Sequence, residues 1–72
     1  MAIILTHHAR ERMALRGISL QMIEETIFVP DTTGRGYSDK LLAFKEFPRG
    51  ILKVVYAING NDHLIISAIW KD

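Results

Sequence analysis

The strongest constraint on the fold is a β-hairpin pattern in the second half of the chain. Residues 51–58 (ILKVVYAI) and 63–70 (HLIISAIW) are rich in β-branched and aromatic side chains, which favour strands. Between them lies Asn59-Gly60-Asn61-Asp62, and Asn-Gly is the strongest short-range signal for a hairpin turn. Residues 63–70 are apolar on both faces for most of their length, which predicts a central or covered position in a sheet.

The first half of the chain instead has helical periodicity and helix-capping residues. Thr6 is an N-cap candidate for a run of good helix formers at 7–16, and Gly17 is expected to end that helix in a left-handed conformation. Ser19 is a second N-cap candidate, for a helix over 20–28 whose apolar residues recur at helical spacing.

Three further segments complete the predicted order of elements. Residues 3–5 form a short apolar run, which indicates an edge strand or an extended lead-in. Residues 31–38 (DTTGRGYS) have the composition of turns and loops, and 40–47 (KLLAFKEF) read as a strand. The order is therefore β-α-α-β-β-β. It predicts an α+β fold with two N-terminal helices packed on a three- to four-stranded, mainly antiparallel sheet.

Composition limits the classes of function. A chain of 72 residues corresponds to one domain, over 1–72, and the absence of cysteine excludes disulfides and thiolate metal sites. No apolar run approaches the roughly 20 residues of a membrane span, and the N-terminus lacks the pattern of a signal peptide, so a cytoplasmic protein is expected. The net charge is only +1, so RNA binding would have to rest on local clustering of the lysines and arginines.

The first predicted helix carries a basic stripe. His8, Arg12 and Arg16 are spaced four apart, which places them along one ridge. Two guanidinium groups and an imidazole on one ridge can bind a phosphate and move a proton, so these three residues are the candidate catalytic set. The alternative is structural: the arginines pair with Glu11 or Glu24 or are solvated, and the histidine caps the helix or lies against the sheet.

A second basic set lies on the predicted sheet and its turn. It is a candidate RNA-binding set and contains Lys45, Arg49, Lys53 and Tyr56. Lys45 and Lys53 would share a face if strands 40–47 and 51–58 pair through a tight turn, and such a face could hold an RNA backbone. The alternative is an ordinary solvated sheet face.

No metal or cofactor is expected. His7 and His8 are adjacent on the helix and point about 100° apart, so they cannot face one ion. His63 by itself does not supply a second cluster.

These residues resemble a known bacterial family. The run from His8 to Ser19 (HARERMALRGIS) resembles the opening "HAxxRMxxRGIS" of the family called domain of unknown function 4258. Residues 52–56 (LKVVY) and 64–68 (LIISA) look like its two closing strands. That family looks like a branch of the RelE/ParE superfamily, and the Ile-Ile-Ser-Ala stretch is similar to BrnT toxins.

The resemblance implies a RelE-like fold and a role as the toxin-like component of a type II toxin–antitoxin system. Ribonuclease toxins of this fold cut mRNA through attack of a 2′-hydroxyl on the adjacent phosphate. His8 would then be the general acid or base, Arg12 and Arg16 would clamp the phosphate, and Lys53 and Tyr56 would be auxiliary sheet contacts. The implied partners are a cognate antitoxin and RNA or the ribosome, with no membrane.

A second hypothesis is a non-catalytic interaction module. An apolar sheet edge or face would pair with an antitoxin peptide or with a second copy of the chain, as a homodimer. The high apolar fraction and the low charge favour this reading. A degenerate toxin or a regulator would belong to this class.

Overall fold

The computed structural model describes residues 2–71 and arranges them in two helices and five strands. In chain order the elements are β1 (Ile3–Leu5), α1 (His7–Arg16), α2 (Leu20–Phe28), β2 (Thr32–Arg35), β3 (Leu41–Phe47), β4 (Gly50–Asn59) and β5 (Asp62–Lys71). The expected α+β class with two N-terminal helices is confirmed. The predicted domain also included residues 1 and 72, which lie outside the described range.

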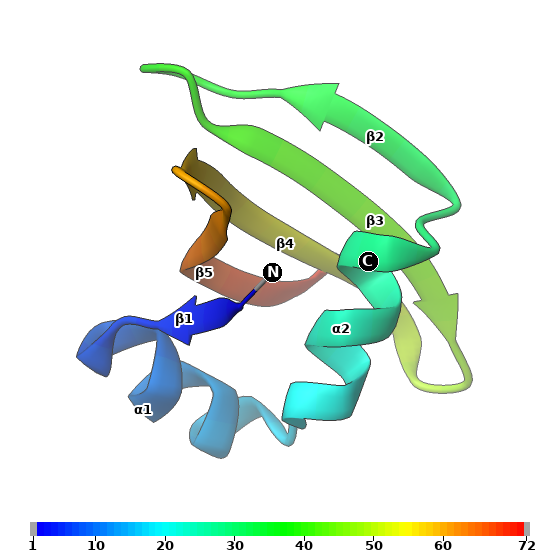
Figure 1. The fold of residues 1–72 in the computed structure, drawn as a ribbon. Coiled ribbons are helices and arrows are strands. Elements are labelled where there is room, and N and C mark those ends of the chain that lie inside the picture. Colours follow the sequence, from blue (N-terminus) through cyan, green and yellow to red (C-terminus); the bar gives the residue numbers. More distant parts are fainter. Residues whose placement is uncertain (1, 72) are drawn as a thin grey trace.

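One sheet contains all of these strands, in the order β1-β5-β4-β3-β2 (Figure 1). β1 pairs in parallel with β5, whereas every other pair of neighbours is antiparallel. The sheet is therefore mixed and has one strand more than the largest number expected. The central position predicted for the last strand is confirmed, because β5 lies between β1 and β4.

The additional strand is β2, in a segment that the sequence predicted to be a loop. That prediction is wrong for Thr32–Arg35, which pair with β3 from Thr32 opposite Phe44 to Arg35 opposite Leu41. The backbone N–H of Asp31 also donates to the Phe44 carbonyl, at 2.8 Å. The segment is short, polar and contains glycine, so its own side chains give no strand pattern. The hydrogen-bond ladder to β3 makes it a strand.

The starts of both helices and the end of α1 follow from local capping, as predicted. The Thr6 hydroxyl accepts a hydrogen bond from the Ala9 N–H at 3.0 Å, and Ser19 accepts one from the Met22 N–H at 3.2 Å. Gly17 ends α1 with φ at +67°, in the left-handed region that glycine enters without steric cost. Each contact spans at most three residues, so sequence alone specifies it.

Both helices pack on the same face of the sheet, which we call the helix side. α1 lies against β5, and α2 lies across β3 and β4 (Figure 1). The buried core between the two layers contains Ala9, Met13, Ile18, Ile23, Ile27, Leu52, Val54, Ile65 and Ala68. This single apolar layer holds the two halves of the chain together.

The other face of the sheet, the open side, is covered by no element of residues 2–71. In β4, Leu52 and Val54 point to the helix side and are buried, while Lys53 and Val55 point to the open side and are partly exposed. Neither helix in this part of the chain has both the length and the hydropathy needed to cross a membrane.

Truncation of Leu52 to alanine tests the position of the core. Leu52 is fully buried, so Leu52→Ala should lower the free energy of unfolding by about 2–5 kcal/mol. Leu15 is 82% exposed on α1, so Leu15→Ala should change it by only about 0.5 kcal/mol. Urea denaturation of both variants measures the difference, and equal losses would contradict this core.

Candidate functional site

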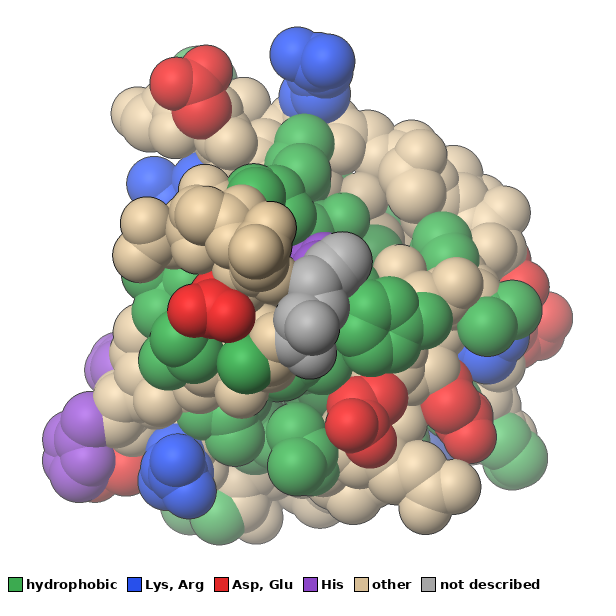
Figure 2. All heavy atoms as spheres, viewed as in Figure 1, with side chains coloured by type: hydrophobic (Ala, Val, Ile, Leu, Met, Phe, Trp, Pro, Cys, Tyr) green, Lys and Arg blue, Asp and Glu red, His purple; other side chains and the backbone are tan. Residues whose placement is uncertain are grey.

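Two members of the predicted basic stripe stand free on α1. His8 and Arg12 are exposed, and neither side chain forms a hydrogen bond or ion pair with another group of residues 2–71. They lie one helical turn apart on the outer surface of α1. Figure 2 shows histidine side chains gathered at the lower left, where α1 begins in the same view. An imidazole and a guanidinium are therefore available to solvent on neighbouring turns.

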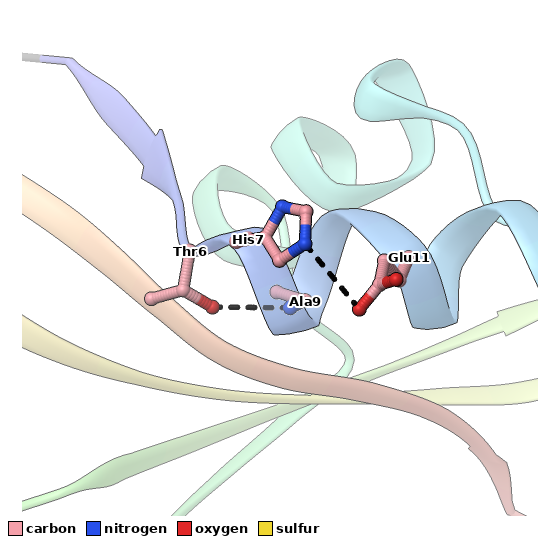
Figure 3. A network of polar contacts seen from close by, with 4 residues as sticks. All are labelled: Thr6, His7, Ala9 and Glu11. Carbon is pink, nitrogen blue, oxygen red and sulfur yellow. Dashed lines mark hydrogen bonds and ion pairs between the residues drawn. The ribbon is translucent and has the colours of Figure 1, made fainter.

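The carboxylate expected to compete for these arginines is engaged elsewhere. Glu11 lies 3.7 Å from the Nε2 atom of His7, its neighbour one turn earlier (Figure 3). Both side chains are largely exposed, so this pair contributes little to stability. The predicted alternative of an ion pair from the stripe to Glu11 is not observed, and Arg12 keeps its guanidinium free.

Arg16, the third member of the stripe, binds the backbone of the last strand. Its Nη1 donates to the Ala68 carbonyl at 2.9 Å. Its own carbonyl, at the end of α1, accepts from Trp70 Nε1 at 2.9 Å and from Arg49 Nη1 at 2.6 Å. The predicted set of three is thus divided, because Arg16 ties α1 to β5 while His8 and Arg12 have no side-chain partner among residues 2–71.

The prediction that Lys45 and Lys53 share a face is wrong. β3 and β4 do pair through a tight turn, but their register sets Lys45 opposite Leu52 and Lys53 opposite Phe44. Lys45 consequently lies on the helix side, where its Nζ donates to the Val29 carbonyl at 2.9 Å. Lys53 lies on the open side, so the two ammonium groups cannot bind one RNA backbone.

The other two members of the sheet set are also separated from Lys53. Arg49 lies in the β3–β4 turn, with its guanidinium carbon 5.0 Å from the centre of the Trp70 ring and its Nη1 on the Arg16 carbonyl. Tyr56 points to the helix side and packs against the core. The four residues therefore belong to three different environments and form no common surface.

His63, for which the sequence suggested only a possible role as a metal ligand, is buried next to Tyr56. His63 is 6% exposed, and its ring lies between Phe28 of α2 and Tyr56 of β4, at centroid distances of 5.5 and 5.4 Å. Its Nδ1 atom has no hydrogen-bond partner in the described part of the chain. The alternation of side chains along β5 indicates that His63 is buried, because it lies two residues before the core residue Ile65 and therefore on the same face.

A cleft of about 450 Å³ lies beside Tyr56, at the β2 edge of the sheet. It is lined by Thr33, Gly34, Arg35, Leu41, Leu42 and Tyr56. The lining contains one guanidinium, two hydroxyl groups and no carboxylate. Sequence reasoning missed the contributions of β2, because that segment was predicted to be a loop.

Comparison with known proteins identifies the family. The model of the family described as Domain of unknown function (DUF4258) matches residues 5–70. The chain belongs to the DUF4258 family. No curated protein and no solved structure gives a significant match to it. Within residues 2–71, no three side chains of the metal-ligating types come together.

The run from His8 to Ser19, which lies within the matched residues, divides into structural and free positions. Ala9, Met13 and Ile18 are buried in the core. Gly17 and Ser19 cap helices, and Arg16 binds β5, as described above. His8 and Arg12 are exposed, and their side chains have no hydrogen-bond or ion-pair partner within residues 2–71.

This division predicts different effects on stability for two arginines of one helix. Arg16→Ala removes the donor to the Ala68 carbonyl and should lower the free energy of unfolding by about 1–3 kcal/mol. Arg12→Ala removes a solvated side chain and should change it by about 0.5 kcal/mol or less. Urea denaturation measures both values, and equal midpoints would show that Arg16 does not tie α1 to β5.

Proposed function

We propose that this protein is the toxin-like component of a bacterial type II toxin–antitoxin system, and that it binds and cleaves mRNA. The observation that supports the proposal most directly is the free pair His8 and Arg12. The other named residues of the DUF4258 opening run have a structural role, whereas these two face solvent. A polar pair that the fold does not need is available for a ligand.

The chemistry of this pair suits a phosphodiester. The Arg12 guanidinium offers a fork of N–H donors that matches two phosphate oxygens. The His8 imidazole can accept a proton at neutral pH and return it. Because Arg16 donates to Ala68, the phosphate clamp in this proposal rests on Arg12 rather than on both arginines.

The proposed reaction needs no group beyond these side chains and the RNA. His8 takes the proton of a 2′-hydroxyl, and the resulting oxygen attacks the adjacent phosphorus. The bond from phosphorus to the 5′-oxygen breaks, and that oxygen takes the proton back from the imidazolium. The products are a 2′,3′-cyclic phosphate and a free 5′-hydroxyl. Arg12 stabilises the charge that develops on the phosphate oxygens.

A growth assay tests this function. The wild-type chain, expressed from an inducible promoter in bacteria, should arrest growth and produce cleaved transcripts. His8→Ala and Arg12→Ala should each restore growth and leave transcripts intact, because each removes one half of the pair. Arg10→Ala is the matched control: Arg10 is exposed on the same helix but points away from the stripe.

The control variant should arrest growth as the wild type does, and the thermal midpoints of all variants should agree within a few degrees. A harmless wild type, or arrest by all variants alike, would exclude His8 and Arg12 as a catalytic pair.

The uncovered open side favours a second candidate, a non-catalytic interaction module. Leu42, Val55, Leu64 and Ile69 point to this side by the register of the strands and are only partly buried. Contiguous apolar surface of this kind is typical of protein–protein contact. In this candidate function the chain binds an antitoxin or a second copy without cleaving RNA.

Light scattering after size exclusion tests the second candidate. An interaction module should elute as a homodimer or should bind the product of the adjacent gene. A clean monomer with no affinity for that product would count against it.

A further inference from the structure

We propose that the cleft at the β2 edge binds a nucleotide of single-stranded RNA, with Arg35 on its phosphate and Tyr56 on its base. This inference rests on the proposed function, because it names a site on the protein that holds the RNA. It adds a binding site that is separate from His8 and Arg12. Its residues come from β2, β3 and β4, and none of them belongs to α1.

The strand register brings the key side chains of this cleft to one face. Thr33 is opposite Ala43, Arg35 is opposite Leu41, and Leu41 is in turn opposite Tyr56. Ala43 is buried against the helix layer, so its cross-strand partners also point to the helix side. The guanidinium, the phenol ring and the Thr33 hydroxyl therefore surround one space.

The helices leave this part of the sheet uncovered. α2 ends at Phe28, and the end of β2 together with the start of β3 extends beyond this helix (Figure 1). Arg35 is exposed at the end of β2, and its side chain has no hydrogen bond or ion pair within residues 2–71. The cleft is therefore open to a ligand from solvent.

The lining chemistry selects an anion that carries an aromatic ring. Arg35 supplies the positive charge, and no carboxylate in the lining opposes it. The Tyr56 ring supplies a stacking surface, and base–aromatic stacking is the usual mode of single-strand recognition. The Thr33 hydroxyl can donate to or accept from a base edge. The volume of about 450 Å³ lies within the range of about 300–1,000 Å³ typical of small-ligand sites.

The ring of Tyr56 packs against another ring of the protein, that of His63. The ring centroid of His63 lies 5.4 Å from that of Tyr56, with the ring planes 39° apart, and Phe28 forms a T-shaped contact with His63 at 5.5 Å. This stack limits the orientations of the tyrosine ring, so less entropy is lost when a base stacks on it. Within residues 2–71 the buried Nδ1 of His63 has no hydrogen-bond partner, so this position holds a polar ring where an apolar one would pack at lower cost.

Fluorescence anisotropy with a labelled RNA octamer tests the site. The octamer carries 2′-O-methyl groups throughout, so the proposed cleavage cannot remove the probe. Arg35→Ala and Tyr56→Leu should each weaken binding about tenfold, and Tyr56→Phe should retain most of the affinity because the ring remains. Lys71→Ala is the matched control, because it removes one positive charge from the open side, where Lys71 lies opposite Ile51.

Arg35→Ala and Lys71→Ala affect exposed side chains, so both variants should fold, and thermal melts check this. Equal loss of affinity in these two variants would show that only net charge matters and would overturn the site. Unchanged binding by Arg35→Ala and Tyr56→Leu, or no binding by the wild type, would also overturn it. None of these results depends on the growth assay, so the site and the catalytic proposal fail separately.

Chemical-shift mapping with uridine monophosphate distinguishes a free nucleotide from a nucleotide within a strand. Shifts confined to residues 33–35, 41 and 56 are expected with both the monophosphate and the octamer, and the octamer should bind more tightly. Shifts centred on the open side would place RNA elsewhere and would overturn the proposal.

Discussion

The fold depends on one junction, at which the end of α1 is bound to the last strand. Arg16 donates to the Ala68 carbonyl, and its own carbonyl accepts from Trp70 and Arg49. These contacts join residues more than 30 positions apart in the chain. They orient α1 over β5, so that Ala9 and Met13 reach the core. A small domain buries little surface, so such a junction contributes a large share of its stability.

The same junction determines which charges remain available to a ligand. Arg16, Arg49 and Lys45 all donate to backbone carbonyls of the protein itself. Six other cationic side chains of residues 2–71 form no side-chain hydrogen bond or ion pair, namely Arg10, Arg12, Arg35, Lys40, Lys53 and Lys71. Among the described residues that set includes Arg12 on α1 and Arg35 on β2. Arg12 lies on the outer surface of α1, and Arg35 points to the helix side by its register, whereas Lys53 points to the open side.

Shape and chemistry also differ between the two sides of the sheet. The open side presents mainly apolar side chains, as a protein-binding surface does. The helix side carries the free histidine–arginine pair on α1 and a cleft with an arginine, a tyrosine and a threonine at the β2 edge. The proposed function requires both a polynucleotide and a protein partner, and this division would let each bind on its own side.

The sequence by itself determined the features that depend on near neighbours. The starts of both helices and the end of α1 follow from Thr6, Ser19 and Gly17, whose contacts are local. The three strands from β3 to β5 follow from alternation and turn chemistry. Only the tertiary structure decided the remaining features. Residues 32–35 form the strand β2 because their backbone hydrogen-bonds to β3. Lys45 and Lys53 point to opposite faces because of the register between β3 and β4, which is a long-range property. The partner of Arg16 and the cleft beside Tyr56 likewise come from segments brought together by the sheet, which no local pattern encodes.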